Sequence, residues 1–200
     1  MNKRILSSAV LLLLMSSCAT YTERPLTADD EAALSAIPFH LSPAARKVFV
    51  ENTLVTSGAK AFAASPDGAF GYGHRYHNLE NAEKAAFNNC SNKSATCQIV
   101  YAVQSKKLPL ENGVRLSDYA YLHYQTYLQM QNPKIFVIGY GGHFNMEYGP
   151  DIKKVRNDAL TPCSAAMRQR TYPDGCVVLS INGELLDIEQ PMRPTLPYTP

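Results

Sequence analysis

Three histidines and five cysteines are the residues of this 200-residue chain whose types and spacing could support chemistry. His74 and His77 stand three residues apart, and together with His143 they could ligate a metal ion. The alternative is a loop with two solvated histidines. No HExxH, G-x-S-x-G or phosphate-loop pattern is present. The sequence therefore offers these histidines for a metal-binding or hydrolytic role, and it assigns no catalytic residue and no cofactor.

Four of the cysteines, Cys90, Cys97, Cys163 and Cys176, form an even set. An even set in an oxidising compartment is typical of disulfides, and four cysteines allow three pairings. The fifth, Cys18, is left over and needs a separate explanation.

Cys18 follows a segment typical of a signal peptide. Lys3 and Arg4 precede an apolar run, 5–15, that is too short to span a bilayer, and two small serines come directly before the cysteine. This ending resembles the bacterial lipoprotein signal, with Met15 where leucine is usual. The resemblance implies cleavage after residue 17 and lipid, palmitate included, on Cys18. The alternative is an ordinary secretion signal that leaves Cys18 as a free thiol.

The mature chain is formally neutral. Without Lys3 and Arg4 it has 17 basic residues, which match its 17 acidic ones. A neutral chain lacks the excess of positive charge that is typical of nucleic-acid-binding proteins and of proteins that adsorb to anionic lipid through a basic patch. We therefore expect a partner in the cell envelope, protein or cell wall, and membrane attachment through the N-terminal lipid. By resemblance, Ala19 after the cysteine implies a periplasm-facing protein of the outer rather than the inner membrane.

The mature chain also has an internal duplication. Five pairs of residues are identical at a constant offset of 74: Leu54 and Leu128, Lys60 and Lys134, Phe62 and Phe136, Gly68 and Gly142, Phe70 and Phe144. With one residue deleted, the helix that begins at Asn78 and leads to Cys90 matches the one that begins at Asp151 and leads to Cys163. The later cysteine opens an apolar strand in each half. The duplication predicts one disulfide per half, Cys90–Cys97 and Cys163–Cys176.

Each half is predicted to fold as helix, strand, strand, helix, strand. Ser42 and Ser117 are helix caps, and Val50 is placed at the equivalent of Tyr124. The turn at 65–68 joins two strands, and 139–142 is its counterpart. The third strand returns after a helix and can pair antiparallel beside the first. We predict an α+β fold of two pseudo-repeats with largely antiparallel sheet, one disulfide in each, and one core shared by both.

The predicted organisation has five parts. Residues 1–17 are the signal peptide, 18–41 a tether with a short helix capped at Thr27, 42–110 the first repeat, 111–188 the second, and 189–200 a proline-rich tail. Each disulfide is expected to join the C-terminal end of a helix to the start of the third strand.

The residues of the first half resemble a known type of module. Ala61 to Gly68, Ala82 to Cys90, and Cys97 are similar to small secreted bacterial domains of unknown function, nearest to the type numbered 4189. The second half keeps Ala159, Leu160 and Cys163 but replaces the S-P-D-G turn with glycines. These shared residues are structural, so the resemblance implies no catalytic residue.

Two function classes follow. The first is a non-enzymatic envelope lipoprotein, a duplicated binding module whose exposed tyrosines and hairpin turns meet another envelope component. The second is a metal-binding protein or hydrolase that uses His74, His77 and His143. A protease inhibitor is a third possibility, since small disulfide-bonded domains of the cell envelope suit that role.

Overall fold

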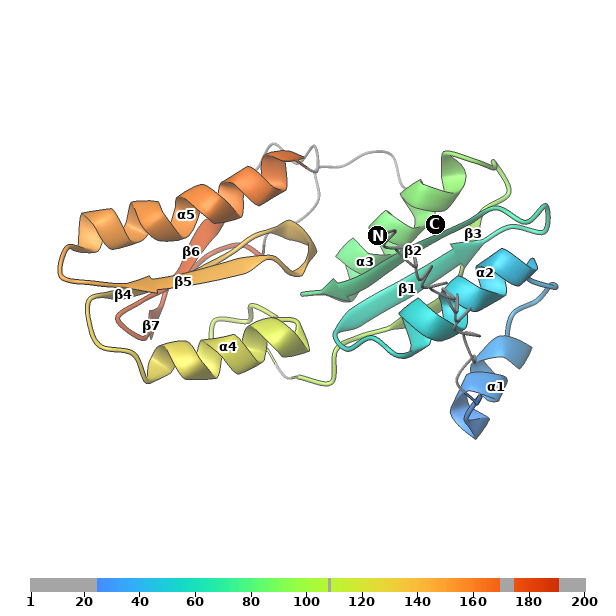
Figure 1. Cartoon of the computed structure of the whole chain (residues 1–200), viewed down its shortest axis with the longest axis horizontal. Helices are drawn as coiled ribbons and strands as arrows, with labels where there is room; N and C mark the ends of the chain where they lie inside the picture. The colour runs from blue at the N-terminus through green and yellow to red at the C-terminus, as the bar shows by residue number, and fades with distance from the viewer. Residues whose placement is uncertain (1–24, 108, 170–174, 191–200) are drawn as a thin grey trace, which may run out of the picture.

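The computed structural model describes residues 25–107, 109–169 and 175–190, and two three-layer units follow each other along this part of the chain (Figure 1). In each unit a small sheet lies between two helical layers, with α3 and α5 over one face and α2 and α4 over the other. Both units follow the predicted order of helix, strand, strand, helix, strand, so the α+β fold with two repeats is confirmed.

The element bounds are as follows. Helix α1 is Ala28–Ser35. The first unit contains α2 (Pro43–Val48), the π-helix η1 (Phe49–Leu54), β1 (Ala59–Ala64), β2 (Phe70–Tyr76), α3 (Leu79–Ser91) and β3 (Gln98–Val103). The second contains α4 (Asp118–Leu128), β4 (Lys134–Ile138), the 3-10 turn η2 (Tyr140–Gly142), β5 (Phe144–Tyr148), α5 (Ile152–Gln169), β6 (Val177–Ile181) and β7 (Glu184–Leu185).

The strand orders are β2-β1-β3 and β5-β4-β6-β7, and every pairing is antiparallel. The predicted place of the third strand beside the first is confirmed in both units. Strands β1 and β4 are buried on both faces because helices cover both. This explains why residues 61–64 and 135–138, which follow the lysine in each strand, are continuously apolar and do not alternate with polar residues. In β1, Phe62 faces the α2 side while Ala61 and Ala63 face α3.

The expectation of one shared core was wrong. Among the described residues, the buried apolar side chains form four clusters, one on each face of each sheet. A sheet with helices on both faces already buries its own apolar surface, so each unit has its own core.

The residues repeated at offset 74 have the same structural roles in both units. The ammonium group of Lys60 donates hydrogen bonds to the carbonyl oxygens of Leu54 and Thr56, at 2.7 and 2.9 Å. Lys134 does the same to Leu128 and Met130, at 2.7 and 2.8 Å. Each lysine thus supplies donors and positive charge at the C-terminal end of the helix before its strand.

The repeated phenylalanines form stacked pairs across each hairpin. Phe62 and Phe70 have ring centroids 5.9 Å apart, and Phe136 and Phe144 have theirs 5.6 Å apart. The turns also match: the Ser65 amide donates to the Ala69 carbonyl oxygen, as the Gly139 amide donates to that of His143. The fourth residue of each turn is the repeated glycine, with φ of +92° and +79°.

Both predicted disulfides are present, Cys90–Cys97 and Cys163–Cys176. Cys90 lies in the last turn of α3, as expected. Cys163 does not end α5, because this helix continues to Gln169 and its added turns bury Met167 completely. The second bond therefore joins the middle of a helix to the start of β6.

Helix α1 begins with the predicted cap. The Asp30 amide donates to Thr27 Oγ1 at 3.2 Å, and the Thr27 amide donates to Asp30 Oδ2 at 2.9 Å. Residues 26–41 then pack on the first unit, where Ile37 and Leu41 join the core on the α2 side. The later half of the segment predicted as a tether is thus part of the folded unit.

Helix α3 lies unusually close to β2 because the strand has glycines there. A Cβ at Gly73 would be 2.4 Å from the Ala82 carbonyl oxygen, and one at Gly71 would be 2.3 Å from that of Ala86. A side chain at either position would push the helix off the sheet, so the crowded strand explains these glycines.

Candidate functional site

His77 is fully buried at the junction of the two units, with 1 % of its surface exposed. Its Nε2 donates to the carbonyl oxygen of His143 at 3.0 Å, and its Nδ1 accepts from the Ser117 amide at 2.9 Å. These partners require the neutral ring with its proton on Nε2. Burial, more than any other effect, lowers the pKa of His77 to about 4.

The other two candidate histidines do not complete a metal site. His74 has its Nδ1 3.4 Å from the carbonyl oxygen of Asn52, and burial lowers its pKa. The backbone oxygen of His143 accepts the hydrogen bond from His77 Nε2. No group of three metal-ligating side chains exists within residues 25–107, 109–169 and 175–190. Because both ring nitrogens of His77 are bonded to backbone groups, the structure gives no support to a metal centre at His74, His77 and His143.

The second hairpin turn is part of the same junction. The Tyr140 hydroxyl donates to the Asn81 carbonyl oxygen at 3.2 Å, and its ring packs edge-on against Tyr76 at 5.4 Å. A Cβ at Gly142 would be 2.0 Å from the Arg75 carbonyl oxygen. This turn was predicted to meet a partner, but it is inserted against the first unit and is not a free surface.

Asp118 links the units a second time. Its carboxylate accepts from the Gly58 amide at 3.0 Å and from the Ser105 hydroxyl. Gly58 and Ser105 lie at the same end of the antiparallel β1–β3 pair, where Lys60 is opposite Val103. Asp118 is also the first residue of α4, where a negative charge is favourable. The start of α4 is thus fixed to the first unit by a charged group.

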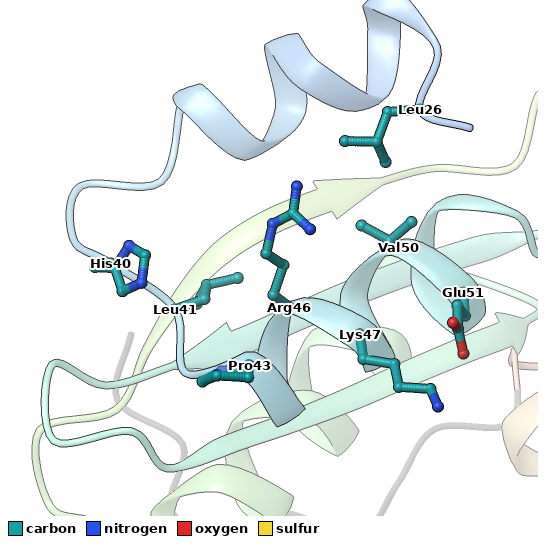
Figure 2. Close-up of a pocket in the computed structure, with 8 residues that line it drawn as sticks. All are labelled: Leu26, His40, Leu41, Pro43, Arg46, Lys47, Val50 and Glu51. Carbon is teal, nitrogen blue, oxygen red and sulfur yellow. The ribbon is translucent and has the colours of Figure 1, made fainter. Parts of the chain in front are cut away.

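An opening lined by apolar and charged side chains lies between α1 and α2. Two adjoining pockets, of about 380 and 370 Å³, share Leu26, His40, Leu41 and Arg46. We call them together the α1 groove. Its apolar lining comes from both helices and the loop between them, and consists of Leu26, Leu34, Phe39, Leu41, Pro43 and Val50. Figure 2 shows the first pocket, in which Leu26, Leu41, Pro43 and Val50 surround Arg46. The volume is within the range of small-molecule sites.

Arg46 is the central polar group of the α1 groove. Its side chain extends from α2 toward Leu26, and Lys47 and Glu51 point away from it (Figure 2). Within the described residues its guanidinium makes no ion pair and donates no hydrogen bond. His40 adds a second nitrogen-bearing side chain, and Glu51 lines the first pocket and Glu31 the second. The arrangement can bind an anionic group beside an apolar one.

The backbone beside this groove differs from its counterpart in the second unit. The helix caps Ser42 and Ser117 are 75 residues apart, whereas Leu54 and Leu128 are 74 apart. Each cap accepts from the third amide of its helix at 3.3 Å, so the caps are equivalent. The first unit therefore has one extra residue between these points, and it is accommodated by the π-helix η1.

The extra residue corrects one predicted equivalence. Phe49, and not Val50, takes the position of Tyr124: Phe49 packs on Phe62 at 5.1 Å as Tyr124 packs on Phe136 at 5.2 Å. Val50 lines the α1 groove instead. π-helical turns are frequent at functional sites. The change of offset from 75 to 74 was the signal in the sequence that could have pointed to this helix.

A third pocket, of about 470 Å³, lies on the equivalent helix of the second unit. Tyr121, Tyr124 and Leu128 line it, with Glu111 and Glu184. No arginine or lysine is among its lining residues. The two units thus carry pockets in equivalent places with different chemistry.

Cys18 and the signal peptide lie outside the described residues, as does the proline-rich tail from residue 191. In the part of the chain that the structure describes, no helix has the length and apolar character needed to cross a bilayer.

Comparisons with protein families, curated proteins and solved structures found no significant match to this chain. The resemblance to the 4189-type domains therefore stays a prediction.

Proposed function

We propose that this protein is a lipid-anchored envelope lipoprotein and a non-enzymatic binding module, whose ligand site is the α1 groove. The N-terminal signal supports the anchor, and the two disulfides are consistent with an oxidising compartment. The polar residues kept in both units have structural roles, since the repeated lysines and serines bond helix ends. A duplicated scaffold with one diverged pocket is consistent with binding rather than catalysis.

The observation that carries the proposal is Arg46 in the α1 groove. Its guanidinium is exposed, makes no ion pair among the described residues and stands beside apolar side chains, so it is available to an anionic ligand. The π-helix η1, beside Arg46, is the main backbone difference between the first helix of one unit and the first helix of the other. This π-helix moves Val50 into the lining of the groove. A ligand with an anionic group and an apolar part would complete this site.

The binding part of the proposal is tested by affinity capture from detergent-solubilised envelopes. The bait is the mature chain, and it is compared with Arg46→Gln and with Arg156→Gln. Arg156 is exposed on α5 of the other unit and serves as the matched control. We expect capture by the wild type and by Arg156→Gln but not by Arg46→Gln. Equal recovery by all three, or background recovery by the wild type, would contradict the assignment of the groove.

The anchor is tested separately. We expect the mature protein to begin at Cys18 with lipid attached, as measured by mass spectrometry of its N-terminal peptide, and to partition into a detergent phase. Cys18→Ser should enter the aqueous phase. A mature N-terminus elsewhere, or an unmodified thiol at Cys18, would refute lipid anchoring without affecting the groove.

A further inference from the structure

We infer that the α1 groove binds one anionic phospholipid of the membrane to which the chain is anchored, with the lipid phosphate on Arg46 and acyl methylenes along the apolar lining. The inference rests on the proposed function, because it names the ligand of that groove and uses the anchor at Cys18. It adds a second, specific membrane contact to the covalent one.

The position of the groove along the chain supports a membrane ligand. Leu26 lines both pockets and stands eight residues after Cys18. Eight residues span at most about 28 Å when fully extended. The groove is therefore held within that distance of the lipid-bearing residue, close to the headgroups.

The shape and chemistry of the groove favour a lipid over a purely polar anion. The lining is continuous through the four residues that the two pockets share. Its apolar members include Val50 in the first pocket and Leu34 and Phe39 in the second. A free phosphate would satisfy the guanidinium and leave this apolar surface in water. An acyl chain beside the phosphate would bury it.

The charge of the protein is compatible with this mode. The neutral mature chain is not expected to adsorb to anionic bilayers through a broad basic patch. Recognition of one headgroup needs one well-placed guanidinium, which phosphate accepts in a bidentate geometry. His40 at the groove adds a second nitrogen-bearing side chain nearby, while Glu31 and Glu51 in the lining disfavour a second anion.

The test uses the full mature chain with Cys18→Ser, so that the anchor does not obscure the measurement. Its probes are dihexanoyl phosphatidylglycerol, dihexanoyl phosphatidylcholine, glycerol phosphate and decanoate, each below its micelle concentration, titrated by calorimetry or by NMR. We expect the phosphatidylglycerol to bind about tenfold tighter than the phosphatidylcholine, as for one charge-assisted contact. Dioctanoyl phosphatidylglycerol should bind tighter still, because more methylenes are buried.

Variants of Arg46 distinguish loss of the guanidinium contact from loss of the fold. Arg46→Gln should remove the preference for the anionic lipid, Arg46→Lys should keep part of it, and Arg156→Gln should keep all of it. Circular dichroism and thermal melting check that each variant is folded, which is expected because Arg46 is exposed.

Several results would overturn the inference. Equal binding of the two lipids, or a preference that survives Arg46→Gln, removes the phosphate contact. Glycerol phosphate binding as tightly as the dihexanoyl lipid shows a phosphate site only, and decanoate binding in its place shows a fatty-acid site. If no lipid binds while the envelope capture still depends on Arg46, the lipid inference fails and the proposed function stands.

Discussion

Acidification should weaken the junction between the two units through His77. In the neutral ring, Nδ1 accepts a hydrogen bond from the Ser117 amide at 2.9 Å, and Nε2 donates one to the His143 carbonyl oxygen at 3.0 Å. A proton added at Nδ1 would place two donors face to face in a site that excludes water. The perturbation is therefore a fall in pH, and the comparison protein is His77→Gln, whose amide does not titrate.

The magnitude follows from the two pKa values of this histidine. In the unfolded chain the ring has its ordinary pKa of about 6.5, and in the folded protein burial lowers the pKa to about 4. Between these values the unfolded chain takes up the proton and the folded chain does not, so stability falls as the pH falls. The loss is about 2 kcal/mol at pH 5 and about 3 kcal/mol at pH 4, relative to pH 8.

The assay is urea unfolding of the wild type and of His77→Gln at several pH values from 8 to 4.5. Carboxylates titrate in both proteins, so their effects cancel in the difference between the two free energies of unfolding. At pH 8 we expect His77→Gln to be less stable by about 1 kcal/mol. The glutamine amide can replace both hydrogen bonds of the His77 ring, but one of them with poorer geometry. The difference should shrink, and then reverse, as the pH falls toward 5.

A difference that stays constant from pH 8 to pH 4.5 would refute the reasoning. Nitrogen-15 NMR of the ring offers an independent check, since the neutral form with its proton on Nε2 should persist at pH 5.5. A charged ring at that pH would show that the folded site accepts the proton.

Three further predictions concern the scaffold. Lys134→Met should lower the free energy of unfolding, measured in urea, by about 1–3 kcal/mol, because two carbonyl groups at the end of α4 lose a charged donor. The control is Lys154→Met, which removes an exposed ion pair and should change the free energy of unfolding little. Gly73→Ala should cost about 1–3 kcal/mol and shift the amide signals of α3, because the added methyl meets a helix carbonyl. Replacing Cys163 and Cys176 together with serine should cost about 3 kcal/mol in the same assay, as loop closure predicts, and a non-reducing digest should link these two cysteines and neither to the first unit.

The repeat and its disulfides could be predicted because their signals are local. Each cysteine pair is close in sequence, 7 and 13 residues apart, and each follows a capped helix. The antiparallel third strand followed from the chain returning after a helix. The end of α5 could not be predicted in this way, because burial of Met167 against the rest of the unit extends the helix past Cys163.

The functional candidates were predicted less well than the scaffold. His74 and His77 were grouped because they are neighbours in sequence, yet their rings meet different partners, Asn52 in one case and the second unit in the other. The groove around Arg46 carries no motif, since its lining comes from two helices and a loop. Only the shift in repeat offset along the first helix indicated that this region differs.

The sequence by itself determined the order of elements, the helix caps, the strand faces and the cysteine pairs, because each depends on residues within about 15 positions of one another. The tertiary structure decided what the polar groups do. His77 is a neutral link because Ser117 and His143, 40 and 66 residues further along, meet its two nitrogens. Arg46 lines a groove because residues 26–41 fold back over its helix. Contacts over such separations depend on how the layers pack, which no local pattern encodes.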